Sequence, residues 1–394
     1  MKNIQERLCR FEEHVKANSV KIMIIGLGSV GTYLLDYLVS SNDPAISVVI
    51  VGRNKEKMEK NLNIVRVAAL IREKNKTNVD IEANVDLNDV ETIAEAIRKH
   101  EPDIIVNSSR AYPGLKYGSI SWNNVRAYGI WTPLSIRFTK NIMEACEDAN
   151  SEALVINTSY SDAVIPWLKS AGKAYPDFGS GNLNHLIPRI RFAAADYLGV
   201  KDFWDIDVVL AAGHFHDVCI SKEGQAEGVN LPMIIRYKGE EKDIPSEEVF
   251  SRCKIIMPTD AQRNMMNASS NYGIINALVK AVRTGENQRV HSPGALGNFG
   301  GYPVIIGYKD GGLNAWIDET DFDFEKMVTA NSASMYLDGV EKIDEGELHY
   351  TNELLAKCKK AFGVELPKKV AFSEIERTAQ FIIDNIITPF TTVS

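Results

Sequence analysis

The sequence has 394 residues, of which 45% are hydrophobic and 24% are charged. This composition is close to the average of globular proteins and argues against disordered and fibrous classes. Because single hydrophobic cores stop growing near about 250 to 300 residues, we expect two or three domains. The formal net charge of −8 disfavours nucleic acid and anionic membrane surfaces as partners.

The cysteines and the lengths of the apolar runs indicate the cellular compartment. The five cysteines are odd in number and show no C-x-x-C spacing, so we expect reduced thiols rather than a disulfide framework or a zinc ribbon. The segment from Met1 to Asn18 is charged and amphipathic and lacks the apolar run of a signal peptide. Every apolar run is far shorter than the roughly 20 residues that a membrane span requires. We therefore predict a cytoplasmic protein.

An N-terminal helix is predicted over residues 1–19. From residue 20 to about 160, short β-rich runs alternate with helical patterns, starting with KIMIIG, TYLLDYLVSS and SVVIVG. Alternating β and α units at this spacing predict an α/β domain built on a doubly wound parallel sheet.

The pattern changes after residue 160. Residues 161–317 mix helices with strands, among them DIDVVLAAGHFH, PMIIRYKG and YPVIIGYKDGG, which predicts an α+β substrate domain. Residues 318–394 are predicted to form a helical C-terminal extension that packs on the second domain.

The first glycine cluster, Gly26-Leu27-Gly28-Ser29-Val30-Gly31, follows an apolar strand and opens an amphipathic helix. In a dinucleotide-binding Rossmann turn, the residue at Gly26 permits the tight turn, Gly28 lets the backbone approach a pyrophosphate, and Gly31 allows close helix-to-strand packing. The phosphates then lie on the N-terminus of the helix, against Ser29 and Val30. A structural glycine turn is the alternative interpretation.

The end of the second predicted strand indicates which dinucleotide is used. NAD enzymes commonly place Asp or Glu there to bind the ribose hydroxyls, whereas this strand ends in Gly52, Arg53 and Asn54. Without a carboxylate at this position a 2'-phosphate is not repelled. The guanidinium of Arg53 can donate charge-assisted hydrogen bonds to that phosphate. We therefore expect NADP rather than NAD, unless Arg53 is only a solvated turn residue.

Further segments follow the glycine cluster in a fixed order, namely DIIVNSSR, INTSYSD, GSGNLNHLIPRIRF, AAGHFHD, SSNYGIINALVKAV and YPVIIGYKDGG. In this order the sequence resembles the lactate/malate dehydrogenase superfamily over roughly residues 20–318. The resemblance implies a soluble enzyme that transfers hydride between nicotinamide C4 and a carbon bearing a hydroxyl group. A histidine moves the hydroxyl proton because its pKa lies near working pH.

The resemblance also assigns residue roles. His214 and His216 are the candidate acid/base residues, and on a strand both would face one side. Arg110, from a mobile loop, and Arg189 occupy the positions that hold a substrate carboxylate, a task that suits the planar guanidinium. Each of these side chains also has a purely structural interpretation, as a core or surface histidine or as an ion-paired arginine.

Three further residues carry roles near the cofactor. Asn157 is expected to bond the reacting oxygen or the nicotinamide ribose, with a strand-end cap as the alternative. Asn107 and Ser108, at the end of DIIVNSS, are expected to contact the cofactor.

The sequence departs from the superfamily at its catalytic elements. Asn184, followed by His185, stands where the family pairs its histidine with an aspartate, and asparagine cannot stabilise an imidazolium by charge. Phe215 falls at the family's histidine position, with a histidine on either side. We therefore do not transfer lactate or malate as the substrate, and we expect a small polar hydroxy, keto or imino compound.

Two other functions remain open. Asn184-His185 resembles an element of the NAD-dependent family 4 glycosidases, which use a divalent metal, although their metal-binding cysteine has no convincing counterpart here. A His-x-His metal site lacks further ligands at suitable spacing, so no metal is predicted. The second alternative is a non-catalytic NAD(P)-binding sensor. In either enzymatic case the expected partner is a small molecule, and the superfamily implies a homodimer or homotetramer.

Overall fold

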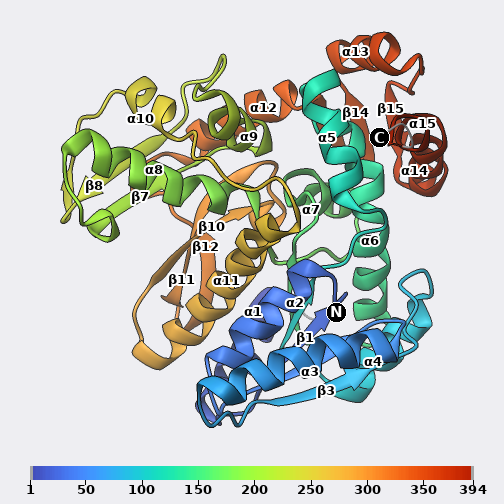
Figure 1. The fold of residues 1–394 in the computed structure, drawn as a ribbon, viewed down its shortest axis with the longest axis vertical. Helices are drawn as coiled ribbons and strands as arrows, with labels where there is room; N and C mark the ends of the chain where they lie inside the picture. Colours follow the sequence, from blue (N-terminus) through green and yellow to red (C-terminus); the bar gives the residue numbers. More distant parts are fainter. Residues whose placement is uncertain (1–2, 392–394) are drawn as a thin grey trace.

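The computed structural model describes residues 3–391, apart from the side chains of residues 115 and 119 (Figure 1). Residues 1–2 of the predicted N-terminal helix and residues 392–394 of the predicted extension lie outside the described residues. Within the described part of the chain, no helix combines the length and the apolar character needed to cross a bilayer.

A six-stranded parallel sheet in the order β3-β2-β1-β4-β5-β6 forms the centre of the N-terminal half. Its strands are β1 (Val20–Ile25), β2 (Ile46–Val51), β3 (Asn78–Glu82), β4 (Ile104–Asn107), β5 (Leu154–Asn157) and β6 (Phe178–Gly179). The predicted doubly wound α/β domain is confirmed. Because β6 joins the same sheet, the sheet continues past the predicted boundary at residue 160.

Strands β1, β2, β4 and β5 are mostly apolar because both faces of the sheet are buried there, whereas the edge strand β3 has exposed polar residues. In β1, Ile22 and Ile24 face one hydrophobic core and Met23 and Ile25 face the other, as side chains alternate along a strand. The first core includes residues of α1 (Ile4–Lys16), α2 (Ser29–Ser40) and α3 (Lys55–Arg72). The second includes residues of α4 (Val90–His100), α6 (Thr132–Asp148) and α7 (Ser161–Ser170). Helix α5 (Gly114–Asn124) follows β4.

The second half contains two antiparallel sheets and mixed helices, in agreement with the predicted α+β character. The sheets are β7-β8-β9 and β10-β11-β12. Their strands are β7 (Ile206–Leu210), β8 (Met233–Tyr237), β9 (Glu240–Glu241), β10 (Gln288–Pro293), β11 (Gly301–Lys309) and β12 (Gly312–Ile317). The helices are α8 (Asn182–Leu198), α9 (His214–Glu223), α10 (Ser246–Arg252) and α11 (Asn264–Thr284), the last preceded by a 3-10 turn, Ala261–Arg263.

One local prediction in this half is wrong. The apolar run DIDVVLAAGHFH was expected to be a single strand, but β7 ends at Leu210 and α9 begins at His214. Gly213 is the N-cap of α9, in an extended conformation. His214 and His216 therefore lie on a helix, where residues two apart are separated by about 200° around the axis.

The C-terminal extension is not purely helical. It contains α12 (Phe324–Leu337), a three-stranded antiparallel sheet, α13 (Asn352–Phe362), α14 (Ile375–Ile382) and α15 (Thr388–Thr391). The strands of that sheet are β13 (Val340–Asp344), β14 (Glu347–Tyr350) and β15 (Lys369–Ala371).

The extension also packs differently from the prediction. Its apolar side chains share the core of α4, α6 and α7 in the first domain, while α12 reaches α9 in the second. Figure 1 shows α13, α14 and α15 beside α5 and α6. The extension therefore bridges the two halves instead of covering the second half alone.

A buried ion pair ties α1 to the sheet. Arg7 Nη2 lies 2.6 Å from Asp177 Oδ1, and the two side chains are 6% and 3% exposed. Asp177 Oδ2 also accepts a hydrogen bond from the backbone N–H of Val155, and Arg7 donates to the carbonyl oxygen of Ala153. The pair fixes the N-terminal helix to the segment that leads into β6.

We expect Arg7→Met to lower the free energy of unfolding by about 3–5 kcal/mol, because it leaves the buried carboxylate of Asp177 without its counter-ion. Urea denaturation measures this change. Lys16→Met is the matched control, since it removes a cation of the same helix from an exposed pair with Glu12 and should cost at most about 1 kcal/mol. Equal losses in the two variants would contradict the assignment.

Candidate functional site

A single large cavity runs from the glycine turn after β1 to α8 and α9. Its volume is about 1180 Å³, somewhat above the roughly 300–1,000 Å³ of typical ligand pockets. Ser108, after β4, lines it together with Gly26, after β1. The strand order reverses between β1 and β4, and ligands of open α/β sheets bind at such reversals, outside the carboxyl ends of the strands.

The glycine turn has the backbone geometry of a phosphate-binding loop. Gly26 has φ +91°, a conformation that L side chains rarely adopt. A Cβ atom on Gly31 would lie 2.2 Å from the carbonyl oxygen of Gly26, so only glycine permits this approach. A Cβ on Gly28 would meet no atom within 4 Å, and Gly28 is the N-cap of α2 without a side-chain capping bond. The N–H groups of α2 are therefore available to an anion.

Ser29, Val30 and Ser108 line the cavity as well. Ser108 Oγ donates to the carbonyl oxygen of Gly26 at 2.6 Å and so holds the turn in place. Asn107 does not line the cavity: it is 1% exposed, and its Nδ2 donates to Asn157 Oδ1 at 3.0 Å. Asn107 therefore makes its hydrogen bonds within the protein and does not face a ligand.

The end of β2 presents cations to the cavity. Arg53 and Lys57 are exposed and line the cavity beside Gly52. Asn54 also lines it, although its Oδ1 accepts a bond from the backbone N–H of Lys57 and caps α3. The nearby acid is Asp86, whose pKa is lowered mainly by a backbone hydrogen bond from Asn88 and further by the charge of Arg53.

At the other end of the cavity His214 is paired with a carboxylate from the C-terminal extension. His214 Nδ1 lies 2.8 Å from Asp338 Oδ2. Asp338 is fully buried and also accepts bonds from Tyr160 Oη at 2.7 Å and from the backbone N–H of Tyr128 at 2.7 Å. A carboxylate accepts hydrogen bonds, so Nδ1 carries the proton and Nε2 is the ring nitrogen left for the cavity.

The surroundings of His214 favour its protonated form. Burial lowers the pKa of this imidazole, but the charge and hydrogen bond of Asp338, with smaller contributions from Asp162 and Asp217, outweigh burial and raise it above its ordinary value of 6.5. The rings of Tyr128 and Tyr160 pack edge-on against the imidazole, with centroids 4.7 and 5.0 Å away. The ring is thus held in one orientation.

His216 lies away from the cavity and is fully buried. Its Nε2 donates to the carbonyl oxygen of Glu227 at 3.1 Å, and its Nδ1 accepts from Ser334 Oγ at 2.8 Å. Both ring nitrogens are therefore occupied, and burial lowers the pKa of His216. Of the two candidates, the structure places only His214 where it can serve a ligand.

Two buried acids accompany His214. Asp162 Oδ1 accepts from the backbone N–H of His214 at 3.0 Å, and Asp217 stands one helical turn along α9. Burial raises the pKa of Asp162 to about 6 and that of Asp217 to about 7, each partly offset by His214. Asp162 Oδ2 and Asp217 Oδ1 have no hydrogen-bond partner, and Asp217 lines the cavity.

The other predicted catalytic residues divide into two groups. Arg110, exposed at the start of the β4–α5 loop, and Arg189, buried on α8, line the cavity. Asn157 does not: its Oδ1 accepts from Asn107 and its Nδ2 donates to Ser161 Oγ at 3.0 Å. Asn184 lies outside the cavity lining, with its Nδ2 buried and unpartnered, while the adjacent His185 lines the cavity.

Sequence reasoning missed the buried partner of His214 and several residues that line the cavity. Asp338 comes 124 residues after His214 and has no motif around it, so no local signal marks it. Asp217 directly follows the histidine pair and could have been found only by treating HFHD as a helix start. Arg263 and Lys222 appear in the sequence as ordinary surface cations.

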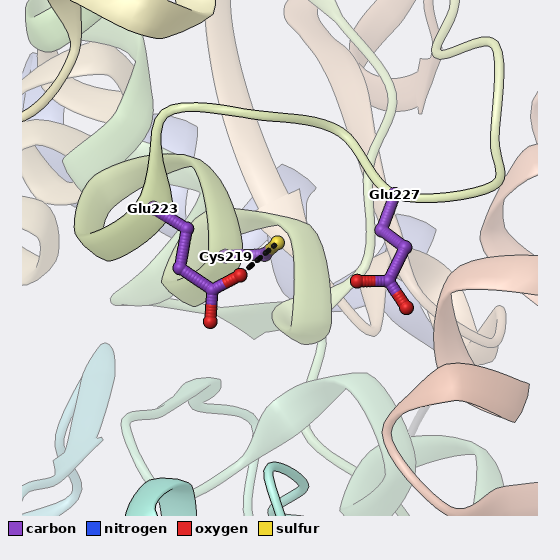
Figure 2. A group of neighbouring side chains, drawn as sticks. All are labelled: Cys219, Glu223 and Glu227. Atoms are coloured by element: carbon purple, nitrogen blue, oxygen red, sulfur yellow. Dashed lines mark hydrogen bonds between the residues drawn. The ribbon is translucent and has the colours of Figure 1, made fainter.

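Potential metal ligands come together at one place in the part of the chain that the structure describes. Figure 2 shows Cys219, Glu223 and Glu227, whose ligand atoms lie within 4.8 Å of one another. Arg126 already occupies this cluster: its Nε donates to Glu223 at 2.9 Å and its Nη1 lies 2.6 Å from Glu227. These bonds raise the pKa of Arg126, and burial raises the pKa of the Cys219 thiol to about 11. The cluster is therefore an ion-pair network in which Arg126 bridges both carboxylates.

Comparisons with known proteins agree with this architecture. Residues 22–117 match the family described as the saccharopine dehydrogenase NADP binding domain. No match was found among curated protein sequences.

Among solved structures, the chain is similar to malate dehydrogenase from Cryptosporidium parvum, with a TM-score of 0.53 and 16% identity over 81% of this chain and 98% of that one. The lactate dehydrogenase of the same organism, complexed with lactic acid and nicotinamide adenine dinucleotide, gives 0.52 and 16% over 81% and 98%. Malate dehydrogenase from Aeropyrum pernix gives 0.52 and 14% over 80% and 97%. The chain therefore has a nicotinamide-dinucleotide-binding dehydrogenase fold, as the sequence predicted.

The pairing of His214 with Asp338 predicts a measurable titration. By NMR, His214 should titrate above 6.5 in the wild type, because Asp338 stabilises the imidazolium. In Asp338→Asn the pKa of the imidazole should fall below its wild-type value, since burial then acts without the largest charge that opposes it. The signal is assigned by its absence from His214→Gln.

Asp344→Asn is the matched control, since it removes an exposed carboxylate of the same extension that pairs with Lys342. It should leave the titration of His214 unchanged. Thermal melting of each variant checks that it is folded. If His214 titrated alike in Asp338→Asn and in the wild type, the pairing would have no electrostatic role.

Proposed function

We propose that this protein is an oxidoreductase that uses NADP, and less readily NAD, to transfer hydride to or from a small polar hydroxy, keto or imino substrate. The observation that carries the proposal is one cavity that joins a glycine turn suited to a pyrophosphate with a carboxylate-paired histidine. The dehydrogenase fold supports it.

The residues of the cavity fit a nicotinamide dinucleotide. The space over Gly28 and the uncapped start of α2 suit the pyrophosphate. Arg53 follows the end of β2, where a 2'-phosphate is bound in such folds, and Lys57 lies beside it in the first turn of α3. When bound, the cofactor supplies or accepts hydride at C4 of its nicotinamide ring.

His214 performs the proton transfer in this proposal. When a hydroxyl group is oxidised, Nε2 accepts its proton as the carbon–oxygen double bond forms, and in the reverse direction the imidazolium returns it. Asp338 holds the ring in the required tautomer and stabilises the imidazolium. Asp338 is thus a positioning residue that acts through His214.

Exchange of His214 tests the catalytic assignment. We expect His214→Gln to lower kcat by about 10²–10⁴-fold, the usual contribution of general acid–base catalysis, while NADPH affinity stays unchanged. The measurement is NADPH turnover against a panel of hydroxy, keto and imino compounds that carry an anionic group.

His216→Gln is the matched control, because both nitrogens of His216 are occupied within the protein and its kcat should stay close to that of the wild type. A wild-type protein that binds neither NADP nor NAD would refute the proposed function.

Exchange of Arg53 tests the cofactor preference. Arg53→Ala should weaken the binding of NADP by about tenfold or more, since a charge-assisted bond to a phosphate contributes roughly 1.5–3 kcal/mol. The affinity for NAD should stay unchanged. Nucleotide titrations followed by fluorescence give both dissociation constants. Arg72→Ala, which removes a cation from the far end of α3, the helix that follows Arg53, should change neither dissociation constant. Equal effects of Arg53→Ala on NADP and NAD would contradict the role in 2'-phosphate binding.

The two alternative functions are not favoured. A metal-dependent glycosidase needs a metal site, and Arg126 fills the one ligand cluster found among the described residues. A non-catalytic sensor has no need of a histidine oriented by a buried carboxylate inside the nucleotide cavity.

The remaining expectations stand as proposals. We propose a small-molecule substrate, no nucleic acid or membrane partner, a cytoplasmic location, and a homodimer or homotetramer. Exposed apolar side chains on α3, at Ile64, Val67 and Ile71, are consistent with an oligomer contact.

A further inference from the structure

Three cations gather on the wall of the cavity beyond His214. Arg189 comes from α8, Lys222 from α9, and Arg263 from the turn before α11. On α9, the cavity-facing residues His214, Asp217 and Lys222 follow helical spacing, so they share one face. From residue 214 to residue 222 the helix axis rises by roughly 12 Å. Lys222 therefore lies within the length of a small substrate from the candidate acid/base, and Arg189 and Arg263 line the same cavity.

Arg189 is a buried cation whose bonds go to uncharged groups. It is 3% exposed, its Nη1 donates to the carbonyl oxygen of Cys253 at 3.0 Å, and its Nη2 lies 3.3 Å from the sulfur of Met257. Its Nε is buried without a hydrogen-bond partner. A buried guanidinium without a counter-ion is costly, so this arginine indicates an anion that the protein itself does not supply.

Arg263 and Lys222 extend the same positive region. Burial lowers the pKa of Lys222, and the charge of Arg263 lowers it further. Burial and, to a smaller extent, the charge of Arg263 also lower the pKa of Arg189, although the charge of Asp217 opposes them. A cation whose charge lowers the pKa of another must lie near it, so Arg263 lies near both Lys222 and Arg189.

The protein's own acids offset this wall only in part, through the charge of Asp217 near Arg189 and that of Glu223 near Lys222. Asp217 is the carboxylate that lines it, and no ion pair joins Asp217 to Arg189, Arg263 or Lys222 among the described side chains. His185, one helical turn before Arg189, adds no charge, because burial and the two arginines lower its pKa to about 3. The wall therefore carries an excess of positive charge in a chain whose net charge is −8.

We infer that Arg189, Lys222 and Arg263 form a subsite for a dianionic group of the substrate, a phosphate monoester or a pair of carboxylates, held beyond the atom that reacts at His214. This inference rests on the proposed function and narrows its substrate class from any anionic compound to one with at least two negative charges at this end. Three donors of fixed positive charge suit an oxyanion with several acceptor oxygens.

The test uses the protein saturated with NADPH, so that the glycine turn is occupied. Inorganic phosphate, succinate and acetate are titrated at pH 7.5 and constant ionic strength, and binding is followed by calorimetry. We expect one of the two dianions to bind at least about tenfold more tightly than acetate, since each charged hydrogen bond contributes about a factor of ten or more. The tighter dianion identifies the group as phosphate or dicarboxylate.

Arg263→Gln and Lys222→Gln should each weaken the binding of that dianion by about tenfold. The affinity for NADPH should stay unchanged. These side chains are less buried than Arg189, so their exchange spares the packing of α8. Lys280→Gln is the control, because Lys280 is an exposed cation on α11 outside the cavity. The subsite is refuted if acetate binds as tightly as both dianions, or if the two cavity variants titrate like Lys280→Gln.

Failure of the proposed function gives a different result. If NADPH does not bind, the same titrations are run on the protein alone. Dianion binding that is lost in Arg263→Gln then supports the subsite without the dehydrogenase assignment, while binding that persists in that variant overturns the subsite.

Discussion

The hydrogen-bonded pair of His214 and Asp338 is the interaction on which the arrangement of the site depends. It joins the first residue of α9 to the residue that ends α12, so it fixes the second half of the chain to the C-terminal extension. The same carboxylate accepts from Tyr160 and from the backbone of Tyr128, both in the first half. A buried carboxylate must satisfy its acceptor capacity within the protein. Three segments are therefore held at one point, and the imidazole between them keeps one tautomer and one orientation.

The cavity carries positive charge although the chain as a whole is acidic. The two ends of the cavity carry cations, Arg53 with Lys57 at one and Arg189 with Arg263 at the other. Asp217 also lines the cavity, but burial raises its pKa to about 7, which limits its negative charge near neutral pH. Low-dielectric walls concentrate the field of the cations inside the cavity. Acids elsewhere on the molecule, such as those around Arg126, are already paired.

Much of the first domain was predictable because its signals are local. The runs at residues 20–25 and 46–51 are apolar on both faces, as a central parallel strand requires, and the glycines at 26 and 31 are imposed by a backbone approach that excludes a Cβ atom. Secondary-structure prediction failed where the pattern of a strand continues into that of the next helix without a break. The run DVVLAAG hides the end of β7 at Leu210, because Ala and Gly fit the end of a strand and the start of a helix equally well. The short strands β13, β14 and β15 have too few residues to show a period of two against the helices around them.

The sequence by itself determined the doubly wound sheet, the glycine turn and the cations at the end of β2, since each depends on residues adjacent in the chain. Only the tertiary structure decided which histidine faces the cavity, because that depends on where a helix begins and not on residue type. It also decided the partner of that histidine: the superfamily order indicated Asn184, whereas Asp338 occupies the role from the far end of the chain. Pairing between distant residues is set by how whole elements pack, and the extension reaches α9 because its apolar faces share a core with α6 and α7. No pattern within a short stretch of sequence encodes that geometry.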